Sequence, residues 1–201
     1  MSALAHIAVI ILAAGRSTRM GAGNKLLADV NGRPMIRHAV EAALASQGKP
    51  VLVVIGHQAG AVREALAGLP IGFVENPCYA GGLSGSLRRG IDALPAGCEG
   101  ALIVLGDMPQ IARAHMDRLI AAFLPGSICV ATHKGKRGNP VLWPAACFAE
   151  MRQLKGDVGA RELMAVHAAQ VREVDVGSEA IFADIDTPEA LARLRREHSA
   201  G

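Results

Sequence analysis

The feature that most constrains this chain is an apolar run that leads directly into a glycine-rich, basic loop. Residues 7–12 (IAVIIL) are uninterrupted, rich in β-branched side chains and of strand length, which is typical of a strand buried on both faces of a parallel sheet. Three glycines and three cations follow within thirteen residues: Gly15, Gly21, Gly23, Arg16, Arg19 and Lys25. Glycines let the backbone approach a ligand closely. The loop therefore predicts a polyphosphate ligand held among cations.

Two well-known phosphate motifs do not fit these residues. A Walker loop needs Gly, four residues, then Gly-Lys-Ser/Thr, but Met20 stands where the second glycine is required. A dinucleotide-binding fingerprint starting at Gly21 needs a third glycine where the chain has Leu26. The simplest alternative is a surface loop without a ligand, which requires the glycines and cations to coincide by chance.

The rest of the chain alternates strand and helix patterns. Its 201 residues suit a single α/β domain covering 1–201, with no repeat or linker to divide it. Alternating strands and helices predict a mainly parallel sheet, whose ligands lie beyond the carboxyl ends of the strands. Hydrophobic residues make up 51% of the chain but aromatic ones only 3%, so the core is expected to be aliphatic.

Charge and cysteine content exclude several classes of protein. The net charge of +3, without a basic stripe interleaved with aromatics, favours small anionic ligands and predicts no nucleic-acid partner. The four cysteines include no C-x-x-C pair, so free thiols are expected. No Lys or Arg precedes the first apolar run, and Arg16 ends it. We therefore expect neither an export signal nor a membrane segment, and a cytoplasmic protein.

A segment rich in glycine and serine, residues 81–88 (GGLSGSLR), is expected to start a helix near Ser84. Free N–H groups and hydroxyls at a helix start suit a nucleotide base or phosphate, so Gly82 and Ser84 are candidate binding residues. Ser84 as a simple helix cap is the structural alternative. A serine hydrolase elbow would need Gly-x-Ser-x-Gly, but the fifth position here is Ser86.

Two aspartates are candidate metal ligands. Asp107 directly follows the apolar run at residues 101–105, which places a carboxylate at the ligand edge of the sheet. Such an oxygen suits Mg²⁺ held against triphosphate oxygens. Asp186 precedes Thr187-Pro188, an ordinary start for a helix, and on the residues alone helix capping explains it equally well.

Several shorter elements are predicted with less pattern to support them. Residues 26–30 and 180–182 are expected to be short strands, and residues 145–154 a helix. Residues 128–131 and 141–143 are predicted to form a hairpin around a basic loop at 132–140. Its cations, beside the only tryptophan, suit an anionic second substrate that contains a ring. A solvated loop is the alternative.

The loop and the motifs after it resemble the nucleotidyltransferases that use a nucleoside triphosphate and release pyrophosphate. Within the MobA-like NTP transferase family, the chain is most similar to the molybdenum cofactor cytidylyltransferases. The resemblance covers nearly the whole chain through residues 12–15 (LAAG), 19–21 (RMG), 25–27 (KLL), 53–57 (VVIGH), 82–87 (GLSGSL), 106–109 (GDMP), 138–142 (GNPVL), 156–161 (GDVGAR) and 184–189 (DIDTPE).

This resemblance implies a Rossmann-like three-layer α/β sandwich of the GT-A-like nucleotidyltransferase type. It also implies that nucleotide contacts come from the loop and that Mg²⁺ is held by two carboxylates. Leu12, Ala13, Ala14 and Gly15 would contact the nucleotide, Arg16, Arg19 and Lys25 its phosphates, and Asp107 and Asp186 the metal. Ala13-Ala14 favours CTP, since the guanylyl branch carries Gly-Gly. The chain departs from the family at Gly85, where serine is expected, and its loop from Gly21 to Lys25 is one residue longer.

The implied reaction joins CMP to the phosphate of the molybdenum cofactor (molybdopterin), releasing pyrophosphate and forming molybdopterin cytosine dinucleotide. A phosphate monoester is largely dianionic at neutral pH, so no general base is required. An apo molybdenum hydroxylase or its chaperone would be a protein partner. Three alternatives stay open: transfer to a sugar phosphate or phospho-acid, a non-catalytic carrier of the cofactor, and an NAD-dependent oxidoreductase, which the failed fingerprint disfavours.

Overall fold

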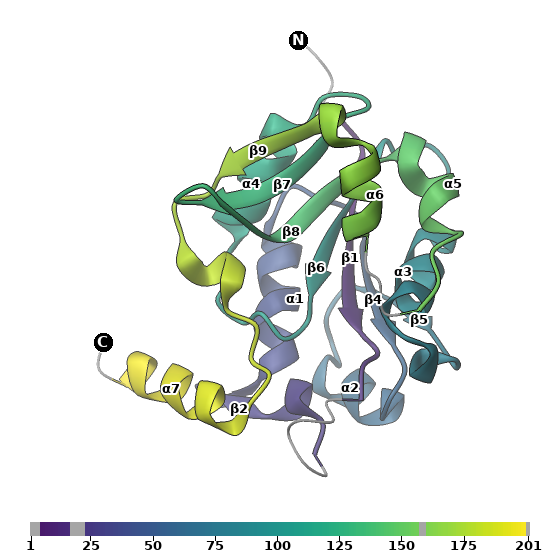
Figure 1. Cartoon of the computed structure of the whole chain (residues 1–201). Helices are drawn as coiled ribbons and strands as arrows, with labels where there is room; N and C mark the ends of the chain where they lie inside the picture. Colours follow the sequence, from purple (N-terminus) through teal and green to yellow (C-terminus); the bar gives the residue numbers. More distant parts are fainter. Residues whose placement is uncertain (1–4, 17–22, 157–159, 200–201) are drawn as a thin grey trace.

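A seven-stranded sheet forms the middle of three layers (Figure 1). The computed structural model describes residues 5–16, 23–156 and 160–199. The strands lie in the order β5-β4-β1-β6-β8-β7-β9, and a separate two-stranded ribbon pairs β2 with β3. Their bounds are β1 Ile7–Ala13, β2 Asp29–Val30, β3 Arg33–Pro34, β4 Val51–Ile55, β5 Gly72–Glu75, β6 Gly100–Leu105, β7 Ile128–His133, β8 Lys136–Pro144 and β9 Val171–Asp175.

Helices cover both faces of the sheet. Residues of α1, α2 and α4 join the hydrophobic cluster on one face, while α3, α5 and α6 pack on the other. The α-helices are α1 Met35–Ala45, α2 Ala59–Ala65, α3 Leu83–Asp92, α4 Arg113–Ala122, α5 Phe148–Met151, α6 Arg161–Val166 and α7 Pro188–Ser199. The 3-10 turns are η2 Lys25–Leu27, η3 Tyr79–Gly81, η4 Ala145–Cys147, η5 Ala168–Gln170 and η6 Glu179–Phe182. The predicted three-layer α/β fold is confirmed.

Strand β1 is buried along its whole length because it lies between β4 and β6 and beneath helices on both faces. Val9 and Ile11 pack toward α1, whereas Ile10 and Leu12 pack toward α3. Such burial explains why the sequence is continuously apolar rather than alternating. Leu12 is in register with Val54 of β4 and with the last residue of β6. The loops after these parallel strands therefore meet at one edge of the sheet.

Strand β8 is the exception to the parallel order, since it runs antiparallel to both β6 and β7. The predicted hairpin is present, but its loop is much shorter than residues 132–140. Only Lys134 and Gly135 lie between the strands, with φ angles of 51° and 74°. Gly138 and Pro140 looked like loop residues, yet both lie within β8. Position 138 requires a glycine because the carbonyl of Ile181 approaches the backbone closely at that residue.

Three further short elements differ from the expectations. Residues 26–30 begin as the turn η2 and only their last two residues form β2. Residues 180–182 belong to the turn η6, where the Ser178 side chain accepts a hydrogen bond from the N–H of Ala180. That local bond closes the turn, so the segment does not extend into a strand. The helix expected at 145–154 is limited to η4 and α5. Among the described residues, no helix is both long and apolar enough to cross a membrane.

We predict that Gly138→Ala lowers the free energy of unfolding by about 1–3 kcal/mol, the usual cost of overpacking. A Cβ atom at this position would lie 2.4 Å from the carbonyl oxygen of Ile181, so η6 would have to move away from β8. Denaturant unfolding measures the change. Gly60→Ala is the matched control: it lies in α2 with no atom near the added Cβ, and should gain about 0.5–1 kcal/mol. Equal stability of the two variants would contradict the close packing of η6 on β8.

Candidate active site

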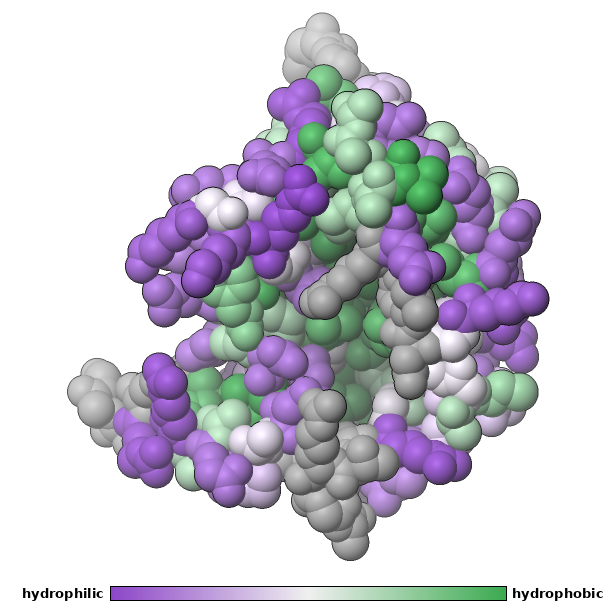
Figure 2. Space-filling view, viewed as in Figure 1, coloured by the Kyte–Doolittle hydropathy of each residue, from purple (hydrophilic) through white to green (hydrophobic). Residues whose placement is uncertain are grey.

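A cavity of about 460 Å³ lies where β1 and β6 end. Figure 2 shows the hollow on the face of the molecule in front of these strands, with hydrophobic residues at its floor. The position is the one expected for a ligand of a parallel α/β sheet. Its lining residues are Leu12, Ala13, Ala14, Gly15, Arg16, Lys25, Leu26, Tyr79, Ala80, Gly82, Leu83, Ser86, Leu105, Asp107 and Asp186.

A lysine between two carboxylates forms the polar end of this cavity. The Nζ of Lys25 donates to Oδ2 of Asp107 at 2.5 Å and also to Oδ1 of Asp186. The two aspartates stand 82 and 161 residues further along the chain. The fold therefore brings the three residues, each singled out in the sequence, into direct contact.

Lys25 is held in place by the turn that carries it. The side chain of Asn24 caps η2 by accepting a hydrogen bond from the N–H of Leu26 at 3.1 Å. The amide of Asn24 also donates to the carbonyl of His57 at 3.4 Å, which ties η2 to the loop after β4. The backbone that carries Lys25 is therefore fixed by the two hydrogen bonds of Asn24.

The two carboxylates keep Lys25 charged. Burial alone would lower the pKa of this ammonium group. The negative charge of Asp107 and the hydrogen bonds to Asp107 and Asp186 outweigh burial and raise the pKa of Lys25 above its ordinary value of 10.5. The side chain is therefore a cation throughout the neutral range, available to a carboxylate or to a phosphate.

The carboxylates also fit a divalent cation. The second oxygen of Asp107, Oδ1, is buried and has no hydrogen-bond partner among the described residues. Asp186 is fixed beside it because the N–H of the buried residue Ile185 donates to the carbonyl of Asp107 at 3.0 Å. No group of three or more His, Cys, Asp or Glu residues gathers in the part of the chain that is described. Two carboxylates completed by water and substrate phosphates match the way proteins hold Mg²⁺.

The loop after β1 forms the wall opposite the carboxylates. Gly15 is exposed, and within the described ranges no atom beyond its immediate neighbours lies within 4 Å of where its Cβ would be. Arg16 is also exposed, with its guanidinium carbon 5.5 Å from the ring centre of Tyr79. Gly56 packs directly against this loop. A Cβ atom at position 56 would lie only 2.9 Å from the Cβ atom of Ala14, so a larger residue would displace the loop. Arg19, predicted to bind phosphate, lies outside the described residues.

The segment that starts helix α3 lines the cavity with one of its two predicted residues, Gly82, but not with the other, Ser84. The helix begins at Leu83 after Gly82, whose φ of 96° marks the turn. Gly82 lines the cavity, as do Leu83 and Ser86. Ser84 instead lines a separate cavity on the other side of this turn. A helix advances by about 100° per residue, so Ser86 lies on a different side of α3 from Ser84.

Tyr79 and Ser86 were not singled out from the sequence. Tyr79 belongs to the turn η3, and its ring centre lies 5.8 Å from that of His57. Ser86 accepts a hydrogen bond from the buried amide of Asn76 at 3.0 Å. Tyr79 could have been identified from the sequence, because it is the only aromatic residue in a glycine-rich segment. The spacing of two residues within α3 is what turns Ser84 and Ser86 to different sides of the helix.

The basic hairpin does not contribute to this cavity. Lys134 pairs with Glu179 at 3.0 Å, and Arg137 pairs with Glu173 at 2.8 Å. Trp143 is buried in the core next to α5 rather than beside these cations. A role for the hairpin in binding a second substrate stays a prediction.

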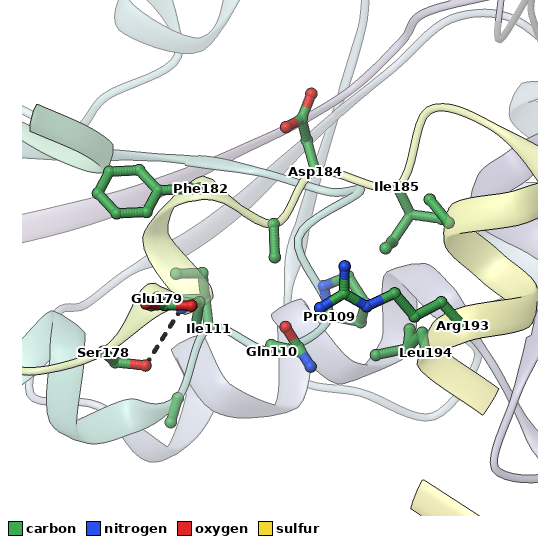
Figure 3. A pocket seen from close by; sticks show the side chains of 14 residues that line it. Pro109, Gln110, Ile111, Ser178, Glu179, Phe182, Asp184, Ile185, Arg193 and Leu194 are labelled. Atoms are coloured by element: carbon green, nitrogen blue, oxygen red, sulfur yellow. Dashed lines mark hydrogen bonds between the residues drawn. The ribbon is translucent and has the colours of Figure 1, made fainter. Parts of the chain in front are cut away.

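A larger cavity, of about 850 Å³, is lined in part by Asp184 and Ile185, the two residues before Asp186 (Figure 3). Its walls are the loop before α4, the turn η6 and one side of α7. Figure 3 shows Arg193 and Leu194 extending from α7, whereas Asp184 points away from them. Glu179 is engaged by Lys134. The charged groups here do not converge on a common point, in contrast to those around Lys25.

Comparison with known proteins identifies the family. The model of the family described as "MobA-like NTP transferase domain" matches residues 9–173 of this chain. The chain belongs to this family. It is 35% identical over 199 residues to the bifunctional protein GlmU of Kineococcus radiotolerans, covering 96% of this chain but only 40% of that protein. It is also 30% identical over 193 residues to the nicotine blue oxidoreductase of Paenarthrobacter nicotinovorans, covering 92% of this chain and 94% of that protein.

Solved structures agree with the fold of this family member. Rv0371c from Mycobacterium tuberculosis H37Rv superposes with a TM-score of 0.85 at 28% identity, covering 96% of this chain and all of that one. A second structure of Rv0371c is a complex with manganese; it has a TM-score of 0.82 and covers 95% of this chain and 98% of that one. The relative thus holds a divalent cation on the same fold.

We predict that Lys25→Met lowers the free energy of unfolding by about 1–3 kcal/mol, less than for a fully buried ion pair. The substitution leaves Asp107 and Asp186 facing each other without the ammonium group that joins them. Added MgCl₂ or MnCl₂ should therefore raise the unfolding temperature of the variant more than that of the wild type.

The matched control is Lys25→Met combined with Asp107→Asn, which removes the repulsion as well as the cation. This double variant should lose the extra metal-dependent gain. Unfolding temperatures of Lys25→Met that equal the wild type with and without metal would show that the lysine does not neutralise the pair.

Proposed function

We propose that this protein transfers CMP from CTP to the phosphate of the molybdenum cofactor, releasing pyrophosphate. The observation that carries the nucleotidyl transfer is the contact of Lys25 with two carboxylates, Asp107 and Asp186, at the polar end of a cavity that the glycine-containing loop also lines. Membership of the MobA-like NTP transferase family supports a nucleoside triphosphate as the donor. Ala13-Ala14 in the cavity wall supports CTP, and resemblance along the chain supports the acceptor. The expected location is the cytoplasm.

The residues present suit a reaction that needs positioning and charge neutralisation rather than a base. The acceptor phosphate is already a nucleophile at neutral pH, so the obstacles are bringing two anions together and stabilising the departing pyrophosphate. Arg16 from the loop after β1 and Lys25 from the turn η2 both line the cavity, so two cations are available to the phosphates. Arg19 is expected to add a third cation.

Asp107 and Asp186 would hold Mg²⁺, with the buried and unpartnered Oδ1 of Asp107 as one ligand atom. The metal would supply positive charge to the triphosphate oxygens. Because Lys25 already bonds both carboxylates, its ammonium group and the metal would compete for the same two side chains. With the aspartates bound to the metal, Lys25 would be free to donate hydrogen bonds to the phosphates of the nucleotide.

The walls of the cavity suit a nucleoside. Tyr79 and Leu83 offer apolar surface at the α3 end, and Ser86 offers a hydroxyl that Asn76 orients. A base stacked on an apolar side chain and hydrogen-bonded at one edge is held by contacts of this kind. The α3 end therefore takes the base and the Lys25 end takes the phosphates.

The second candidate is an oxidoreductase, which the relative of Paenarthrobacter nicotinovorans favours through its name and its 94% coverage. A nicotinamide cofactor would then occupy the cavity. Oxidation of NADH or NADPH in the presence of an electron-accepting dye, with no pyrophosphate released from any nucleotide, would favour this candidate over nucleotidyl transfer.

The deciding experiment measures magnesium-dependent pyrophosphate release from ATP, CTP, GTP and UTP separately, with and without the molybdenum cofactor. Release that requires both CTP and the cofactor is the expected result. Release with CTP and a sugar phosphate or phospho-acid instead would retain the reaction and replace the acceptor. Binding of the cofactor without release from any nucleotide would identify a carrier.

We predict that Asp107→Asn lowers the turnover number by about 10²–10³-fold, the scale on which loss of one charge-stabilising group slows an enzyme. The amide keeps the shape of the side chain but not the charge that holds the metal. Glu173→Gln is the matched control, because it removes one carboxylate from the exposed strand β9. Near-normal turnover of Asp107→Asn with an unchanged unfolding temperature would remove Asp107 from the site.

A further inference from the structure

A separate cavity of about 420 Å³ lies on the other side of the first turns of α3. Its cations are Arg88 and Arg89 of α3 and Lys155, which follows α5. Among the described residues, no hydrogen bond or ion pair engages these three side chains. Among the described residues of the wall, Asp92 is the one carboxylate, and it already accepts a hydrogen bond from Arg152 at 2.8 Å. The described lining of the cavity therefore carries an excess of positive charge.

A serine side chain on an almost fully buried residue points to a ligand in the same place. Ser84 lines this cavity although its exposed fraction is only 2%. Its backbone N–H donates to the carbonyl of Gly156 at 3.2 Å, but its side-chain hydroxyl has no partner among the described residues. The hydroxyl is not one of the fully buried atoms without a partner, so it can be reached from the cavity. A bound group with acceptor oxygens would accept a hydrogen bond from Ser84.

The location adds a favourable field. Ser84 and Gly85 belong to the first turn of α3, a helix of ten residues. The amino end of a helix carries partial positive charge, which favours an anion. Two arginines are suited to phosphate oxygens because a guanidinium group presents paired donors. Charge, hydroxyl and helix end all favour the same ligand chemistry.

We propose that this cavity is a second anion site, which binds a small phosphate-bearing molecule through Arg88, Arg89, Lys155 and Ser84. It is distinct from the cavity around Lys25, called the nucleotide cavity below. The nucleotide cavity shares none of these four residues. The site does not depend on which base or acceptor the enzyme uses. Its ligand is either a free phosphate or pyrophosphate ion, or the phosphate group of a larger metabolite.

The test is calorimetric titration of the full chain in metal-free buffer with inorganic phosphate, pyrophosphate and ribose 5-phosphate as probes. Arg88→Gln combined with Arg89→Gln should weaken binding of the best probe at least tenfold, and Ser84→Ala about threefold. Arg16→Gln, in the nucleotide cavity, should leave this binding event in place. The charge-matched control is Arg63→Gln combined with Arg137→Gln, two exposed arginines with partners elsewhere, and it should also retain the event.

The order of the probes identifies the source of the ligand. Tighter binding of ribose 5-phosphate than of both ions supports a phosphorylated metabolite, and the reverse order supports a free ion. The proposal is overturned if the wild type binds no probe, or if the variant lacking Arg88 and Arg89 binds as tightly as the charge-matched control. Pyrophosphate release by that variant should stay within twofold of the wild type, which separates this outcome from a failure of the proposed transfer reaction.

Discussion

The candidate site depends on the ion pairs that Lys25 makes with Asp107 and Asp186. Two carboxylates that share a small space repel each other unless a cation lies between them. The fold supplies that cation from the turn η2, whose cap by Asn24 holds it in position. The backbone bond from Ile185 to Asp107 then fixes the spacing of the two aspartates. A divalent metal can take the place of the ammonium group, and in the proposed reaction Lys25 moves from carboxylate to phosphate.

Most of the sheet was predictable because burial imposes a recognisable pattern. The strands β1, β4 and β6 lie between neighbours and under helices, so each is a continuous apolar run. The elements that were missed depend on individual contacts, one between distant segments and one local. Gly138 belongs to a strand because Ile181 packs against its backbone, and residues 180–182 turn because of a local bond to Ser178. Neither contact leaves a periodic pattern in the sequence.

The candidate site was only partly predictable. Asp107 was identified from its place after a buried strand, since the end of a parallel strand is a position that sequence reveals. Asp186 was assigned from resemblance alone, because the chain folds it back onto β6 from far away. Ser84 was predicted because it stands at the expected start of a helix, whereas Ser86, which lines the cavity, lies further along the helix. The catalytic roles of these residues stay predictions that the variants above test.

The first turns of α3 explain why one short segment serves two cavities. Ser86 faces the nucleotide cavity and Ser84 faces the cationic one. Asn76 lies beside both: its amide donates to Ser86, while its side chain also lines the cationic cavity. Asn76 is almost fully buried and its oxygen accepts a hydrogen bond from the N–H of Cys78. Asn76 therefore connects the two cavities physically, and under the two proposals an anion that shifted its amide would also move the hydroxyl of Ser86.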